Sequence, residues 1–153
     1  MPKIGTKAPS FALLNQRGEK VKLSDHLGSK VVLFAFPKAN TPGCTAQACG
    51  FSAALPRFAK QGAVIFGISP DAPAALARWK EQQGLAFDLL SDPDHKVLAT
   101  WGAWGEKSMY GKKYEGVIRS HWIVGEDGRV LDERIKVSPA DSVAMAEKFL
   151  SES

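Results

Sequence analysis

Two cysteines, Cys44 and Cys49, are the residues of this chain whose type and spacing could do chemistry. Cys44 follows Thr41-Pro42-Gly43, in which threonine suits the N-cap of a helix and proline suits the first helical position. Cys44 would then be the third residue of the helix, where free backbone N–H groups and the helix dipole favour an anion. This position favours the nucleophilic thiolate, especially beside an arginine. The alternative is a small buried apolar residue, a common fate of free cysteine.

Cys49 lies five residues further along the same predicted helix. Five helical residues rise ~7.5 Å and turn ~140°, which places the two Cα atoms roughly 8.5 Å apart. A disulfide spans about 4.4–6.8 Å between Cα atoms, so the pair cannot bond while the helix is intact. Either the cysteines never bond, or the helix unwinds locally when they do. Gly50 and Pro56 weaken a helix by about 1 and 3 kcal/mol, which is consistent with a segment that opens.

Metal binding is the less favoured use of these thiols. The cysteines do not have C-x-x-C spacing, and the three histidines lie far from them in the sequence, at His26, His95 and His121. We therefore expect no metal site and no cofactor, and we interpret each histidine as a surface or packing residue.

Composition is typical of one globular domain covering residues 1–153. The chain has 153 residues, of which 44% are hydrophobic and 24% charged. A chain of this length can bury a core without a stabilising disulfide. Two cysteines in a reducing compartment are then more often catalytic than structural.

The charge pattern argues against nucleic-acid and membrane partners. The net charge is +4, but the basic residues are interspersed with acidic ones, and the densest cluster is only Lys112-Lys113. The longest apolar run, residues 31–36, has six residues, far fewer than a membrane span requires. The N-terminal residues 1–9 contain no apolar signal-peptide core. We expect a protein of the cytoplasm that binds neither nucleic acid nor membrane.

The order of predicted elements indicates a thioredoxin-like α/β fold, with a mixed central sheet and helices on both faces. Residues 31–36 and 63–69 are apolar runs typical of buried strands, and the helix within 41–62 connects them in a parallel βαβ unit. Glu126-Asp127-Gly128 predicts a hairpin turn between strands at 116–124 and 129–137. The remaining predictions are strands at 11–14, 20–23 and 87–90, helices at 72–83, 97–101 and 139–150, and a long loop at 102–116.

Residues 36–49 resemble the active-site segment of the peroxiredoxins, and within them the bacterioferritin comigratory protein or peroxiredoxin Q group. The family signature Pro-x-x-x-Thr/Ser-x-x-Cys is matched by Pro37, Thr41 and Cys44. Further segments match in order along nearly the whole chain, at 67–71, 90–93, 104–107, 109–111 and 119–120.

The resemblance implies a role for each matching position in peroxide reduction. Cys44 would attack the distal oxygen of a hydroperoxide and become a sulfenic acid. Thr41 would hold the peroxide through its hydroxyl, and Arg119 would stabilise the thiolate and the developing charge. Pro37 would shield the thiolate pocket from water, and Gln47 would hold Arg119.

The same resemblance implies that Cys49 is the resolving cysteine, which forms an intrachain disulfide with Cys44. Thioredoxin or glutaredoxin would then reduce the disulfide, and hydrogen peroxide and organic hydroperoxides would be the substrates. Because resolution within one chain requires no second subunit, we expect a monomer.

Two other functions are compatible with a reactive thiol on this fold. A general thiol–disulfide oxidoreductase would use both cysteines, but it would favour C-x-x-C spacing and leave Thr41 and Arg119 without a role. A redox-sensing module would keep the reactive thiol without turnover. Peroxide consumption with a dithiol reductant separates these possibilities.

Overall fold

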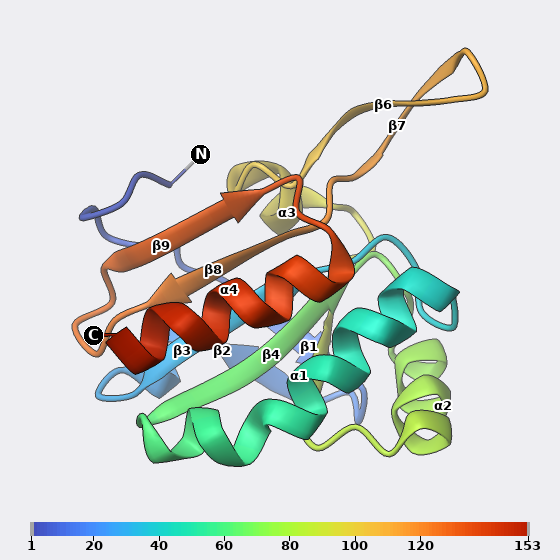
Figure 1. The fold of residues 1–153 in the computed structure, drawn as a ribbon. Coiled ribbons are helices and arrows are strands. Elements are labelled where there is room, and N and C mark those ends of the chain that lie inside the picture. Colours follow the sequence, from blue (N-terminus) through green and yellow to red (C-terminus); the bar gives the residue numbers. More distant parts are fainter. Residues whose placement is uncertain (1, 153) are drawn as a thin grey trace.

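A seven-stranded mixed sheet in the order β2-β1-β5-β4-β3-β8-β9 forms the centre of the molecule (Figure 1). The computed structural model describes residues 2–152, with Met109 by its backbone alone. The sheet strands are β1 (Ala12–Asn15), β2 (Lys20–Lys22), β3 (Lys30–Ala35), β4 (Ala63–Ser69), β5 (Asp88–Ser91), β8 (Ser120–Val124) and β9 (Val130–Ile135). The helices are η1 (Leu23–His26), α1 (Pro42–Lys60), α2 (Pro73–Gln83), α3 (Lys96–Thr100) and α4 (Pro139–Glu152).

The predicted βαβ unit is confirmed, since β3 and β4 pair in parallel and α1 connects them. On the other edge of β3, the strand β8 runs antiparallel and carries the chain on to β9. The segment that resembles a peroxiredoxin active site, residues 36–49, therefore begins directly after the buried strand β3.

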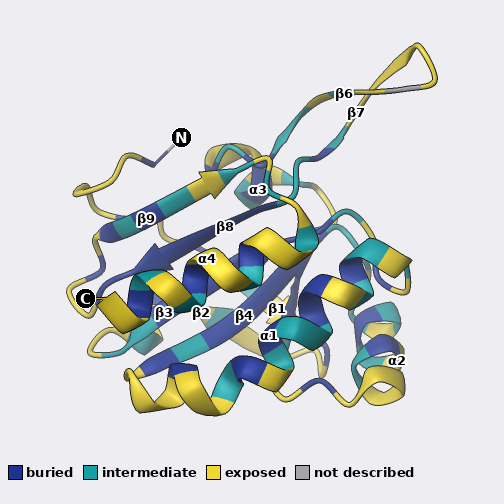
Figure 2. Ribbon diagram, in the orientation of Figure 1, coloured by how far each residue is buried: buried dark blue, intermediate teal, exposed yellow. Residues whose placement is uncertain are grey.

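Helices cover both faces of the sheet, which confirms the thioredoxin-like prediction. Side chains alternate between the faces of a strand. Val32 and Phe34 accordingly join the core under α1, α2 and α4, while Val31 and Leu33 join the core shared with α3. Figure 2 shows α1 and α4 with buried residues toward the sheet and exposed residues outward. No helix within residues 2–152 has both the length and the apolar character needed to cross a membrane.

The prediction of a long loop at 102–116 is wrong. Two strands, β6 (Trp104–Met109) and β7 (Lys112–Val117), form an antiparallel hairpin that projects from the body (Figure 1). Tyr110 and Gly111 connect them with φ of 52° and 78°, the geometry of a type I′ turn. The sequence did not predict this turn, because the first turn residue is tyrosine, which seldom adopts positive φ. Because residues 112–117 belong to β7, the next hairpin begins at Ser120 rather than at residue 116.

Gly50 lies where α1 meets α4. A Cβ atom at this position would be 2.9 Å from Cγ2 of Val143, closer than real Cβ contacts come. The glycine is thus required for close helix packing, and its interpretation as a helix-weakening residue is incomplete. Pro56 is also accommodated, because α1 continues through it to Lys60.

Candidate active site

Cys44 is the third residue of α1, as predicted from the helix signals. Thr41 is the N-cap and Pro42 the first helical residue, and the Thr45 N–H donates to the Thr41 carbonyl at 2.8 Å. The N–H of Cys44 therefore belongs to the amide groups that the helix start leaves without an intrahelical acceptor. The Cys44 side chain is 1% exposed, so its sulfur sits in a largely water-free site at the positive end of a helix.

Arg119 approaches the sulfur from the segment between β7 and β8. Its Nη2 lies 3.5 Å from Cys44 Sγ, although the residues are 75 positions apart in sequence. A Cβ on Gly43 would lie 3.0 Å from Arg119 Nη2, so the missing side chain leaves room for the guanidinium. A positive charge at this distance stabilises the thiolate form of cysteine.

A buried polar chain continues from Arg119 into the protein. Arg119 Nη1 donates to Gln47 Oε1 at 2.7 Å, and Gln47 Nε2 donates to Ser142 Oγ at 3.1 Å. Ser142 Oγ lies 2.7 Å from His121 Nδ1. Gln47, Ser142 and His121 are each fully buried. The structure thus brings Gln47 to Arg119, and it adds two residues that were not predicted at the site.

His121 was expected to be a surface or packing residue, and Ser142 was assigned no role. Strand alternation could have predicted the burial of His121 near the site. In β8, His121 shares the face of Ile123, which points toward α1 and α4. Burial lowers the pKa of His121 to about 4, with a raising influence from Asp132 and a lowering one from Arg134. The imidazole is therefore neutral at neutral pH.

The loop between β3 and α1 carries Pro37 and Thr41. Pro37 is half-buried and directly follows the fully buried Phe36. The Thr41 hydroxyl donates to the Lys38 carbonyl at 2.8 Å and makes no side-chain cap to the helix, so its lone pairs remain available as acceptors. Asp71, a third unpredicted contributor, fixes the loop by accepting the Ala39 N–H at 2.7 Å.

Cys49 is half-buried on the same unbroken helix, and both cysteines are free thiols. Its Sγ lies 3.7 Å from Gln83 Oε1 on α2. The helix geometry keeps the two cysteine Cα atoms roughly 8.5 Å apart, beyond disulfide range. No group of three or more His, Cys, Asp or Glu suited to a metal ion occurs in the described part of the chain.

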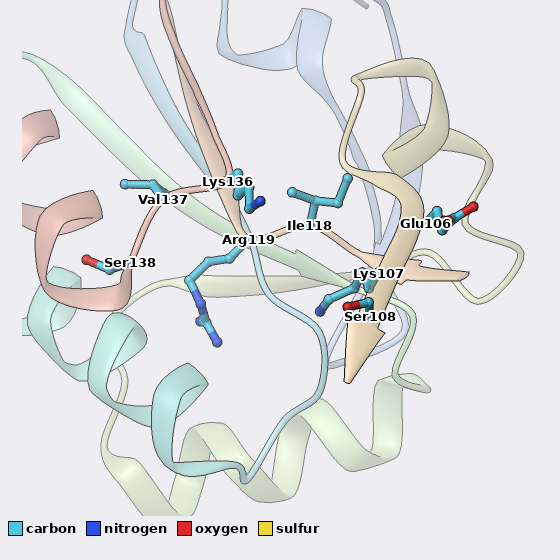
Figure 3. Close-up of a pocket in the computed structure, with 8 residues that line it drawn as sticks. All are labelled: Glu106, Lys107, Ser108, Ile118, Arg119, Lys136, Val137 and Ser138. Atoms are coloured by element: carbon cyan, nitrogen blue, oxygen red, sulfur yellow. The ribbon is translucent and has the colours of Figure 1, made fainter. Parts of the chain in front are cut away.

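A cleft of about 610 Å³ opens beside Arg119 (Figure 3). Its walls come from the β6–β7 hairpin, the segment before β8 and the segment between β9 and α4. The lining includes three cationic residues, Lys107, Arg119 and Lys136, and one acidic residue, Glu106, which pairs with Lys113. The lining residues are Glu106, Lys107, Ser108, Ile118, Arg119, Lys136, Val137 and Ser138.

The chain is similar to known proteins in both sequence and fold. The AhpC/TSA family matches residues 4–132. Peroxiredoxin Bcp of Bacillus subtilis is 42% identical over 149 residues, covering 97% of this chain and 95% of that relative. Peroxiredoxin Bcp of Escherichia coli is 45% identical over 128 residues, covering 84% and 82%. The solved bacterioferritin comigratory protein of Xanthomonas campestris has 33% identity and a TM-score of 0.87, covering 93% of this chain and 90% of that one.

Proposed function

The chain belongs to the AhpC/TSA family and is a thiol-dependent peroxidase, a peroxiredoxin, and we propose that Cys44 is the residue that attacks the peroxide. The observation that carries this assignment is the Arg119 guanidinium, 3.5 Å from Cys44 Sγ at the start of α1. The helix start and the arginine both favour a thiolate there. Cys49 has no such surroundings, since it lies in the middle of α1 beside Gln83.

In the first step the Cys44 thiolate attacks the distal oxygen of the hydroperoxide. An S–O bond forms as the O–O bond breaks, which gives a sulfenic acid that keeps the hydroperoxide proton and an alkoxide or hydroxide that takes up a proton from solvent water. Arg119 and the Cys44 N–H supply donors for the charge on the oxygens. The Thr41 hydroxyl, whose own proton is donated to the Lys38 carbonyl, would accept a hydrogen bond from the peroxide O–H. Pro37 would limit water at the sulfur.

In the second step the Cys49 thiol attacks the sulfur of the sulfenic acid. The Cys44–Cys49 disulfide forms and water leaves. Because the Cα atoms of an intact helix stand roughly 8.5 Å apart, the first turns of α1 must unwind for this step. An external dithiol then reduces the disulfide by exchange and restores both thiols.

The physiological reductant would be a thioredoxin or a glutaredoxin, acting on a monomer in the reducing cytoplasm. A disulfide made within one chain needs no second copy. The half-buried position of Cys49 supports access for the reductant's thiol once α1 has opened. Reduction by thioredoxin but not glutaredoxin, or the reverse, would identify the partner.

The organic part of a hydroperoxide would occupy the cleft beside Arg119. Ile118 and Val137 provide apolar contacts there, and Lys107 and Lys136 favour a negatively charged substituent. The solved Xanthomonas campestris relative is described in terms of alkyl peroxide reduction, which is consistent with a cleft of this kind.

The assignment is tested by peroxide consumption with a dithiol reductant and by mass spectrometry after one equivalent of peroxide. Cys44→Ser should abolish turnover while keeping the fold. Cys49→Ser should retain the first oxidation and accumulate a sulfenic acid at Cys44. Substantial peroxide turnover by Cys44→Ser, with Cys49 as the sole thiol, would refute the assignment.

A further inference from the structure

We propose that Ser142 and His121 are positioning residues for Arg119, acting by fixing the orientation of the Gln47 amide. The inference rests on the proposed role of Arg119 at Cys44. The four side chains come from three elements and the segment before β8, and they form one continuous buried chain.

The directions of these hydrogen bonds follow from the chemistry of the groups. Arginine has donors and no acceptor, so Gln47 must present its Oε1 to Arg119 Nη1. The Gln47 NH₂ group then faces Ser142 and must donate to Ser142 Oγ, 3.1 Å away. Within the described chain, the remaining side-chain neighbour of Ser142 Oγ is His121 Nδ1 at 2.7 Å, so the serine proton points to that nitrogen.

His121 completes the chain as an acceptor at Nδ1, with its proton on Nε2. No hydrogen-bond partner for Nε2 occurs among the described residues, so hydrogen bonding fixes the ring through Nδ1. The groups that face the ring are Phe51 on α1, at 6.4 Å between ring centroids, and the charged Asp132 and Arg134 on β9. Burial favours the neutral imidazole, which is the form that can accept.

A rotated Gln47 amide would place its NH₂ group against the guanidinium, where donor meets donor. Arg119 would then lose its 2.7 Å contact and its fixed distance from Cys44 Sγ. The chain to His121 disfavours that rotation, because the rotated amide would present an oxygen to Ser142. Ser142 Oγ would then donate to Gln47, and His121 would have to move its proton from Nε2 to Nδ1 to remain in the chain. α4 and β8 thus set the position of the arginine although neither reaches the sulfur.

The test compares substitutions that differ in where a polar atom is placed. His121→Asn keeps an amide two bonds beyond Cβ, where Nδ1 lies, whereas His121→Gln places it three bonds beyond, where Nε2 lies. Ser142→Ala and His121→Gln should each slow Cys44 oxidation by about tenfold or more, because small displacements of a catalytic group have effects of this order. His121→Asn should retain most of the rate. Equal rates for His121→Asn and His121→Gln would refute the inference.

A double-mutant cycle separates positioning from a general loss of stability. His121→Gln should slow oxidation far less in a Gln47→Ala background, since the chain is already broken there. An undiminished effect would show that His121 acts by another route. If Arg119→Ala oxidises as fast as the parent, the role of Arg119 itself fails; if only the His121 and Ser142 variants match the parent, the inference alone fails.

Nitrogen NMR of the histidine rings tests the same point in the unmodified protein. The His121 resonances should report a neutral ring protonated at Nε2, with Nδ1 in a hydrogen bond. A ring protonated at Nδ1 at neutral pH would overturn the proposed directions, whatever the variants show.

Discussion

Acidification should destabilise this protein through His121 in a defined pH window. Burial holds the pKa of His121 at about 4, whereas an imidazole in the unfolded chain titrates near ~6.5. Between these values the unfolded chain binds the proton and the folded chain does not, so the free energy of unfolding falls as pH falls. The loss begins near the unfolded value and is complete below the folded one.

The size of the effect follows from the two values. At pH 5 the linkage relation gives a loss of about 2 kcal/mol relative to neutral pH, and the full difference amounts to about 3 kcal/mol. A small domain is stable by only about 5–15 kcal/mol, so the loss is large enough to measure.

Urea unfolding at several pH values between 7.5 and 4.5 provides the assay. His121→Gln should unfold with a shallower dependence on pH than the parent, because its side chain does not titrate. His26→Gln serves as the matched control, since His26 is only half-buried and packs on Phe66 at the edge of the core. Parallel pH dependences for the parent and His121→Gln would show that the imidazole is not held neutral and would refute the reasoning.

Three further predictions concern the reaction. Arg119→Ala and Thr41→Val should each slow Cys44 oxidation by ~10²–10³, the usual effect of losing a transition-state contact, as measured by stopped-flow tryptophan fluorescence; a change below threefold would contradict their roles. One equivalent of peroxide should give the Cys44–Cys49 disulfide and faster amide hydrogen exchange in the first turns of α1; equal protection in both redox states would show that the helix does not open. Lys136→Gln should raise the KM for a carboxylate-bearing hydroperoxide several-fold and leave that for a neutral one unchanged; equal changes for both would exclude charge recognition in the cleft.

The sequence predicted those parts of the molecule that depend on local signals. Thr41-Pro42 marks the start of α1, and the apolar runs mark β3 and β4 to within one residue. The pairing of Arg119 with Cys44 followed from the family pattern and not from spacing, because nothing local connects residues 75 positions apart.

The parts that escaped prediction depend on tertiary contacts or unusual backbone conformations. The β6–β7 hairpin turns at Tyr110, whose positive φ no residue preference indicates. The contact from Gln47 to Ser142 spans 95 positions and joins α1 to α4, so only the packed helices reveal it. His121 is distinguished from an ordinary packing residue only by what lies next to its Nδ1.

The close approach of Gly50 to Val143 connects helix packing to reduction potential. If α1 unwinds when Cys44 and Cys49 bond, every contact that favours the wound helix favours the dithiol over the disulfide. For a two-electron couple, about 1.4 kcal/mol of such preference makes the disulfide ~30 mV more oxidising. Val143→Ala, which loosens the contact with Gly50 without changing either cysteine, should therefore make the disulfide harder to reduce. The packing of two helices then acts as a thermodynamic control on how readily the oxidised enzyme accepts electrons.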